Sequence, residues 1–80
     1  MKIHILVAIK TKCKDKEQIF QIVKKLRLNK FSFILDENYI PKIMPNNMVV
    51  IRGLIPKKEI KNIKKLPRVI NIFNDQPLIS

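Results

Sequence analysis

Residues able to perform catalysis or to hold a metal are few in this sequence. One histidine, His4, and one cysteine, Cys13, are present. A structural zinc site takes four ligands, commonly from paired cysteines and histidines, and these two side chains alone do not supply them. Asp36 and Glu37 are adjacent carboxylates in a turn-forming stretch, whereas acid–base catalysis needs carboxyl groups whose pKa values are separated by burial. We therefore expect no enzymatic activity, no metal site and no cofactor.

The strongest chemical signal is positive charge. Seventeen lysines and arginines stand against six aspartates and glutamates, for a net charge of +11. This balance favours anionic partners, such as nucleic acid, a membrane surface or an acidic protein. A nucleotide composition bias in the source explains the charge equally well. If the charge is functional, the candidate phosphate contacts are Lys57, Lys61, Lys64 and Lys65.

These lysines belong to a segment that predicts a helix followed by a strand. Pro56 suits the first helical position, because its missing N–H does no harm there. Ile60, Ile63 and Leu66 recur at helical spacing until Pro67 stops the helix. The lysines fall outside this apolar stripe and must face water, and the strand follows at 69–73.

Two segments predict central strands of a sheet. KIHILVAIK at 2–10 and MVVIRGL at 48–54 are apolar on both faces. Neither contains the aromatic side chains on which an RNA-recognition sheet stacks bases. Any nucleic-acid binding is therefore expected to be sequence-blind phosphate contact that weakens steeply with salt.

An edge strand and a first helix complete the expected elements. FSFIL at 31–35 predicts the edge strand, with Phe31 and Phe33 on the face packed under the helices. Asp15 and Gln18 have the spacing of a capping box, which predicts a helix from there to residues 28–29.

The order of these elements, β-α-β-β-α-β, predicts an α+β fold of the ferredoxin-like sandwich type. Its antiparallel sheet has the order 4-1-3-2, and both helices lie on one face. On the open face, Leu6 and Ala8 are expected to be partly exposed beside alternate residues of 48–54. A contiguous exposed apolar surface on a small domain usually marks an interface, so Leu6 and Ala8 are candidate interface residues.

Residues 1–80 are expected to form a single domain, with 74–80 as a C-terminal tail. The N-terminal stretch has no signal-peptide pattern, and no segment approaches the ~20 apolar residues that span a bilayer. We expect a cytoplasmic protein from the sequence as given, and leave open whether it belongs to a longer precursor.

One family pattern matches the second half of the sequence. VVIRGLIPKKEIKNIKKLPRVINIFND contains a strand, a lysine-rich helix, a Leu-Pro-x-Val step and a strand that closes on an aspartate. This pattern resembles the subtilisin-type propeptide and peptidase-inhibitor family. The matching positions are Leu66, Pro67, Val69, Ile72 and Asp75. HILVAIK, at 4–10, is similar to the first strand of that family, which typically ends in a lysine.

The resemblance implies a non-enzymatic domain that binds a subtilisin-type serine protease as inhibitor, folding chaperone or both. Such a domain packs the open face of its sheet on the protease and inserts its C-terminal tail into the active-site cleft. An extended tail can also add as a strand to the edge of an enzyme's sheet. The tail residues are Asp75, Gln76, Pro77, Leu78, Ile79 and Ser80, with Leu78 and Ile79 filling pockets. The alternatives are a basic nucleic-acid-binding domain and a small oligomeric module such as a homodimer.

Overall fold

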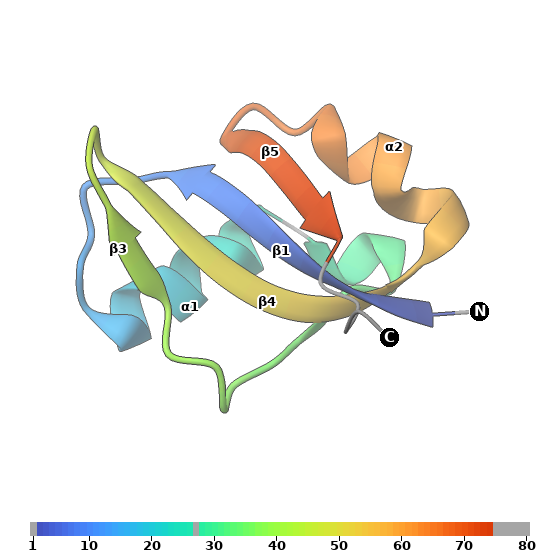
Figure 1. Ribbon diagram of the computed structural model, residues 1–80, viewed down its shortest axis with the longest axis horizontal. Coiled ribbons are helices and arrows are strands. Elements are labelled where there is room, and N and C mark those ends of the chain that lie inside the picture. Colours follow the sequence, from blue (N-terminus) through green and yellow to red (C-terminus); the bar gives the residue numbers. More distant parts are fainter. Residues whose placement is uncertain (1, 27, 75–80) are drawn as a thin grey trace, which may run out of the picture.

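The computed structural model describes residues 2–26 and 28–74, which form an α+β fold with a five-stranded antiparallel sheet (Figure 1). In chain order the elements are β1 (Lys2–Lys10), α1 (Lys16–Lys25), the 3-10 helix η1 (Leu28–Phe31), β2 (Ile34–Leu35), β3 (Lys42–Met44), β4 (Met48–Pro56), the 3-10 helix η2 (Lys57–Glu59), α2 (Ile60–Lys64) and β5 (Val69–Asn74).

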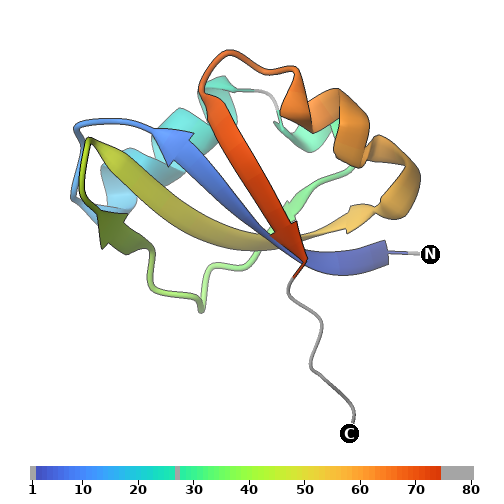
Figure 2. The same ribbon diagram turned by 45° about the horizontal axis from the view of Figure 1, so that its top comes forward.

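The two long apolar strands are central, as predicted. The sheet order is β2-β4-β1-β5, and β1 pairs with β4 from Lys2↔Pro56 to Lys10↔Met48. Figure 2 shows β5 along the other side of β1. The four expected strands keep their expected order. A fifth strand, β3, adds to the four strands of the predicted sheet; it pairs with the start of β4, while β2 pairs with the C-terminal half.

The core lies on one face of the sheet. The odd-numbered residues of β1, from Ile3 to Ile9, are all buried, because successive side chains of a strand point to opposite faces. They share one cluster with Ile19 and Val23 of α1 and with Ile63 of α2. α1 crosses behind the sheet (Figure 1). Both helices therefore cover the same face.

The prediction of an extended strand over 31–35 is wrong in its extent. Phe31 belongs to η1, and Ser32 has a left-handed φ of 61°, so the extended backbone begins only at Ile34. The Phe33 side chain is buried against Gly53 of β4, where the missing Cβ leaves room for the ring. The packing of Phe33 into the core is confirmed, although it lies outside the strand.

Both helices differ in detail from the sequence pattern. α1 ends at Lys25 rather than at 28–29, and its N-cap residue, Asp15, makes no side-chain capping hydrogen bond. The predicted capping box is therefore not formed. Pro56 ends β4 and caps η2 instead of opening the helix. The lysines of this segment are exposed, as predicted.

A β-bulge sets which side chains of β5 reach the core. Ile9 pairs with Val69 while Ala8 pairs with Asn71, so the register shifts between them. An extra residue in one strand lets two positions three apart face the same side. Val69 is buried and Ile72 packs against the core, although a regular strand would place them on opposite faces.

Candidate functional site

The sheet face turned away from the helices carries the even-numbered residues of β1 and β4. We call it the open face. The strand registers place His4, Leu6, Ala8, Ile34, Val50, Arg52, Leu54, Asn71 and Phe73 in its central part, and Lys2, Lys10, Lys42, Met44, Met48 and Pro56 towards its ends.

Four apolar side chains on this face form what we call the apolar stripe: Leu6, Ile34, Leu54 and Phe73. Leu6 is directly opposite Phe73 on β5, and Leu54 is directly opposite Ile34 on β2. Directly opposed side chains on one face of an antiparallel pair touch each other. Phe73 is 48% exposed and Ile34 is 50% exposed, so both ends of the stripe project into solvent.

Ala8, predicted to be partly exposed, is only 1% exposed. Its single methyl group lies between the larger side chains of Val50 and Asn71, its opposite residues on the two neighbouring strands. The expected exposure of Ala8 is therefore wrong. Leu6 is half-buried and belongs to the apolar stripe.

An ion pair borders the apolar stripe. The guanidinium of Arg52, which is opposite Leu6 on β4, donates to Oδ2 of Asp36 at 2.6 Å. The Asn38 amide donates to Oδ1 of the same carboxylate at 3.0 Å. The hydrogen bond from Arg52 is the main cause that holds the pKa of Asp36 below its usual value. The predicted turn at Asp36 is confirmed, and it ties the loop after β2 to the open face.

A hollow of about 480 Å³ adjoins the stripe at this end of the sheet. His4, Ile34 and Leu54 line its apolar part, while Asp36 and Glu37 make its rim acidic. The Nδ1 atom of His4 is buried and has no hydrogen-bond partner among the described residues. The hollow is thus an acidic spot beside an apolar surface, in a chain whose net charge is +11.

The other predicted site residues do not join the open face. Lys57, Lys61, Lys64 and Lys65 are exposed on and just after η2 and α2, on the helix side of the sheet. Of the predicted tail, 74–80, Asn74 is the last residue of β5 instead, and 75–80 lie outside the described residues.

Sequence reasoning missed three of the four residues of the apolar stripe. Ile34 and Phe73 depend on the short extent of β2 and on the bulge in β5, neither of which leaves a periodic signal. Leu54 was missed because the pattern at 48–54 is apolar on both faces, so either face could be the buried one.

The described residues contain neither a cluster of metal ligands nor a helix that could span a membrane. No group of three histidine, cysteine, aspartate or glutamate side chains there has an arrangement that would hold a metal ion. Within 2–26 and 28–74, no helix has the length and apolar character needed to cross a membrane.

No family model, curated protein or solved structure matches this chain.

Proposed function

We propose that this chain is a non-enzymatic protein-binding domain that docks through its open face. The observation that carries this proposal is the apolar stripe, in which Phe73 and Ile34 are about half exposed although the neighbouring core residues of β1 and β4 are buried. Burying apolar surface is the main favourable term in protein association. The ion pair of Arg52 and Asp36 and the acidic hollow would supply the polar rim that surrounds the apolar centre of such interfaces.

The sharper form of the proposal is a ferredoxin-like domain that acts as a propeptide-like inhibitor or folding chaperone of a subtilisin-type serine protease. The resemblance at Leu66, Pro67, Val69, Ile72 and Asp75 supports it. The bulge that turns both Val69 and Ile72 to the core gives a physical reason why the pattern needs apolar side chains at these two positions. The extra strand β3 departs from the six-element ferredoxin-like scheme.

The mechanism would use two contacts. The apolar stripe would pack on the surface of the protease, and residues 75–80 would lie in its active-site cleft as a product-like strand. Phe73 directly precedes Asn74, the last residue of β5, so the tail continues in sequence from a residue of the apolar stripe. Main-chain hydrogen bonds of the tail would give affinity, and Leu78 and Ile79 would give selectivity.

Inhibition of a subtilisin-type protease by the purified chain tests this function. We expect deletion of residues 76–80 to abolish inhibition while the circular dichroism spectrum is kept. Phe73→Asp should weaken inhibition about tenfold or more, because it places a charge within an apolar contact. Lys57→Asp, on the opposite side of the sheet, is the matched control and should retain inhibition. Failure of the parent chain to inhibit, or full inhibition by the truncated chain, would contradict the proposal.

A second copy of this chain is the other occupant that could cover the apolar stripe. Sedimentation analysis distinguishes the two, since a homodimer that Phe73→Asp converts to monomer would assign the stripe to self-association.

Nucleic-acid binding is the second candidate function, and the exposed row of lysines on η2 and α2 favours it. Lys61 and Lys65 are four residues apart on one exposed side. Contacts to phosphates would weaken with a logarithmic salt slope of about −0.9 per phosphate neutralised on duplex DNA. The double reversal of Lys61 and Lys65 to glutamate should abolish retention on a polyanion column and leave protease inhibition unchanged. Absence of any mobility shift at low salt would dismiss this function.

A further inference from the structure

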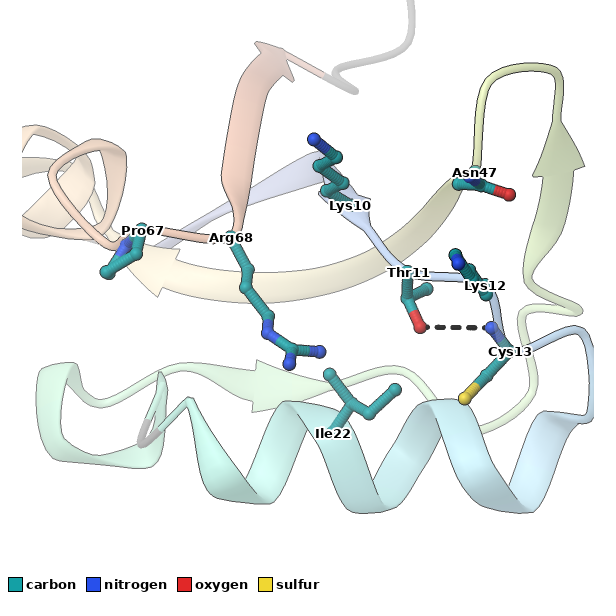
Figure 3. A pocket seen from close by; sticks show the side chains of 8 residues that line it. All are labelled: Lys10, Thr11, Lys12, Cys13, Ile22, Asn47, Pro67 and Arg68. Atoms are coloured by element: carbon teal, nitrogen blue, oxygen red, sulfur yellow. Dashed lines mark hydrogen bonds between the residues drawn. The ribbon is translucent and has the colours of Figure 1, made fainter.

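A cavity of about 470 Å³ lies where β1 ends, β5 begins and α1 passes beneath both (Figure 3). Three cationic residues line it, Lys10, Lys12 and Arg68, and none of its lining residues is acidic. Figure 3 shows that the Lys10 ammonium points away from α1, so Lys10 borders the cavity on its outer side. We propose that this cavity binds a small phosphate monoester, a function separate from docking at the open face.

Arg68 is the first group that would hold the phosphate. Its backbone carbonyl accepts a 2.8 Å hydrogen bond from the Lys10 amide, which fixes the start of β5 against the end of β1. Its guanidinium points toward α1 above Ile22, into the same space as the sulfur of Cys13 (Figure 3). No ion pair of this guanidinium is recorded within the described part of the chain. An unpaired guanidinium presents a planar fork that matches two oxygens of a phosphate or a carboxylate.

Thr11 is the second group that would contact the phosphate. The residue is only 7% exposed, and its Oγ1 atom accepts a 3.1 Å hydrogen bond from the Cys13 amide. Its hydroxyl also carries a proton to donate, and no acceptor for that proton is recorded among the described residues. The hydroxyl is therefore still able to donate one hydrogen bond. A ligand oxygen in the cavity would supply the acceptor.

The chemistry of these groups selects phosphate over carboxylate. Arg68, Lys12 and the Thr11 hydroxyl are all donors, so the ligand must be an anion rich in acceptors. A phosphate group carries nearly two negative charges and three strong acceptor oxygens, whereas a carboxylate carries one charge and two oxygens.

The cavity also has an apolar part, and this selects an ester over free phosphate. Ile22 and Pro67 contribute apolar walls. The volume of about 470 Å³ lies within the range of small-molecule sites, roughly 300–1,000 Å³. The phosphate would bind at Arg68 and Thr11, and the organic group would lie against Ile22 and Pro67.

Cys13 makes the proposal testable, because it is the only cysteine and it lines the cavity. Alkylation of Cys13 by the neutral reagent N-ethylmaleimide can be followed by mass spectrometry. Adenosine monophosphate is the probe, with adenosine and inorganic phosphate as comparisons. We expect adenosine monophosphate to slow alkylation, inorganic phosphate to need a higher concentration, and adenosine to have no effect. Calorimetric titration of the same probe gives its affinity.

Arg68→Gln and Lys61→Gln each remove one positive charge from an exposed position. Only Arg68 lines the cavity, so comparing the two variants distinguishes binding in the cavity from nonspecific attraction to the basic protein. Arg68→Gln should weaken adenosine monophosphate about tenfold, the value of one charge-assisted hydrogen bond. Lys61→Gln should leave the affinity within twofold. Equal losses in both variants, no protection of Cys13 at millimolar probe, or equal binding of adenosine would each overturn the proposal. Inorganic phosphate binding as tightly as the ester would overturn the assignment of a monoester.

Discussion

Gly53 and Phe33 show how a single missing side chain positions a whole segment. A Cβ at Gly53 would press on the ring of Phe33 and would stand 2.7 Å from the Ile34 carbonyl oxygen. Contacts this short between a Cβ and its neighbours are not tolerated without movement. Because the ring packs over Gly53, the chain turns at Ser32 before it joins the sheet at Ile34.

We therefore expect Gly53→Ala to lower the free energy of unfolding by about 1–3 kcal/mol, the usual cost of overpacking. Urea denaturation measures this loss. In a Phe33→Leu background the same substitution should cost less, because the leucine side chain does not reach as far. An unchanged denaturation midpoint for Gly53→Ala would contradict the account of this contact.

Asp36 makes stability depend on pH. The hydrogen bond from Arg52 lowers its folded pKa below the usual 3.8. The contribution to stability is therefore fully present above pH 3.8 and is lost as the pH falls through the lower folded pKa. Asp36→Asn should be less stable than the parent at pH 7, and the difference in free energy of unfolding should shrink in acid. Glu37→Gln, next in the chain, is the control; a difference for Asp36→Asn that stays constant with pH would contradict this assignment.

At the residue scale, sequence reasoning identified only the part of the site that a regular strand determines. Leu6 follows from the alternation in β1, whose buried partners Ile5 and Val7 are fixed by the same pattern. Ala8 was misjudged because alternation gives the face of a residue but not the size of its neighbours. Phe73 was missed because its face depends on an irregular register.

At the scale of elements, α2 is held in place by packing rather than by its own helical tendency. It spans five residues, far fewer than the ~12–15 that an isolated helix needs to be marginally stable. Ile63 is its one buried side chain and is fully enclosed. The position of the helix and of its lysines therefore depends mainly on Ile63, with Ile60 partly buried against the same core.

Ile63→Ala should lower the free energy of unfolding by about 2–5 kcal/mol, and Ile63→Val by about 0.5–1.5 kcal/mol. Denaturation with urea, followed by circular dichroism, measures both values. Lys64→Ala, on the exposed side of the same helix, should change stability by less than about 0.5 kcal/mol. A cost for Ile63→Ala no larger than that of Lys64→Ala would show that packing does not hold α2.

The elements that sequence reasoning predicted well are those whose pattern is long and regular. β1 was predicted over its whole length, and the prediction for β4 lacked only its last two residues. Each strand has nine residues, and its apolar pattern is long enough to be recognised in the sequence. β2 and β3 span two and three residues, and their positions follow from tertiary contacts with β4. The register shift of β5 likewise comes from its pairing with β1, so it could not be predicted from the sequence of β5 alone.

At the scale of the whole molecule, the sheet has two different faces. Ile5, Val7 and Ile51 belong to a closed core under the helices, while Leu6 and Phe73 belong to the open face. A contiguous apolar surface exposed on a small domain usually marks an interaction site, which is the basis of the docking proposal. The lysines of α2 and the cavity at Arg68 lie elsewhere, which allows each proposed activity to be tested separately.

Methyl NMR of the labelled chain, titrated with a subtilisin-type protease whose nucleophilic serine is replaced by alanine, tests the central claim most directly. We predict that the methyl signals of Leu6, Ile34 and Leu54 shift or broaden, while those of Ile60 on α2 stay unchanged. Signals that change on α2 and not on the open face, or that do not change at all, would contradict the claim that the open face is the docking surface.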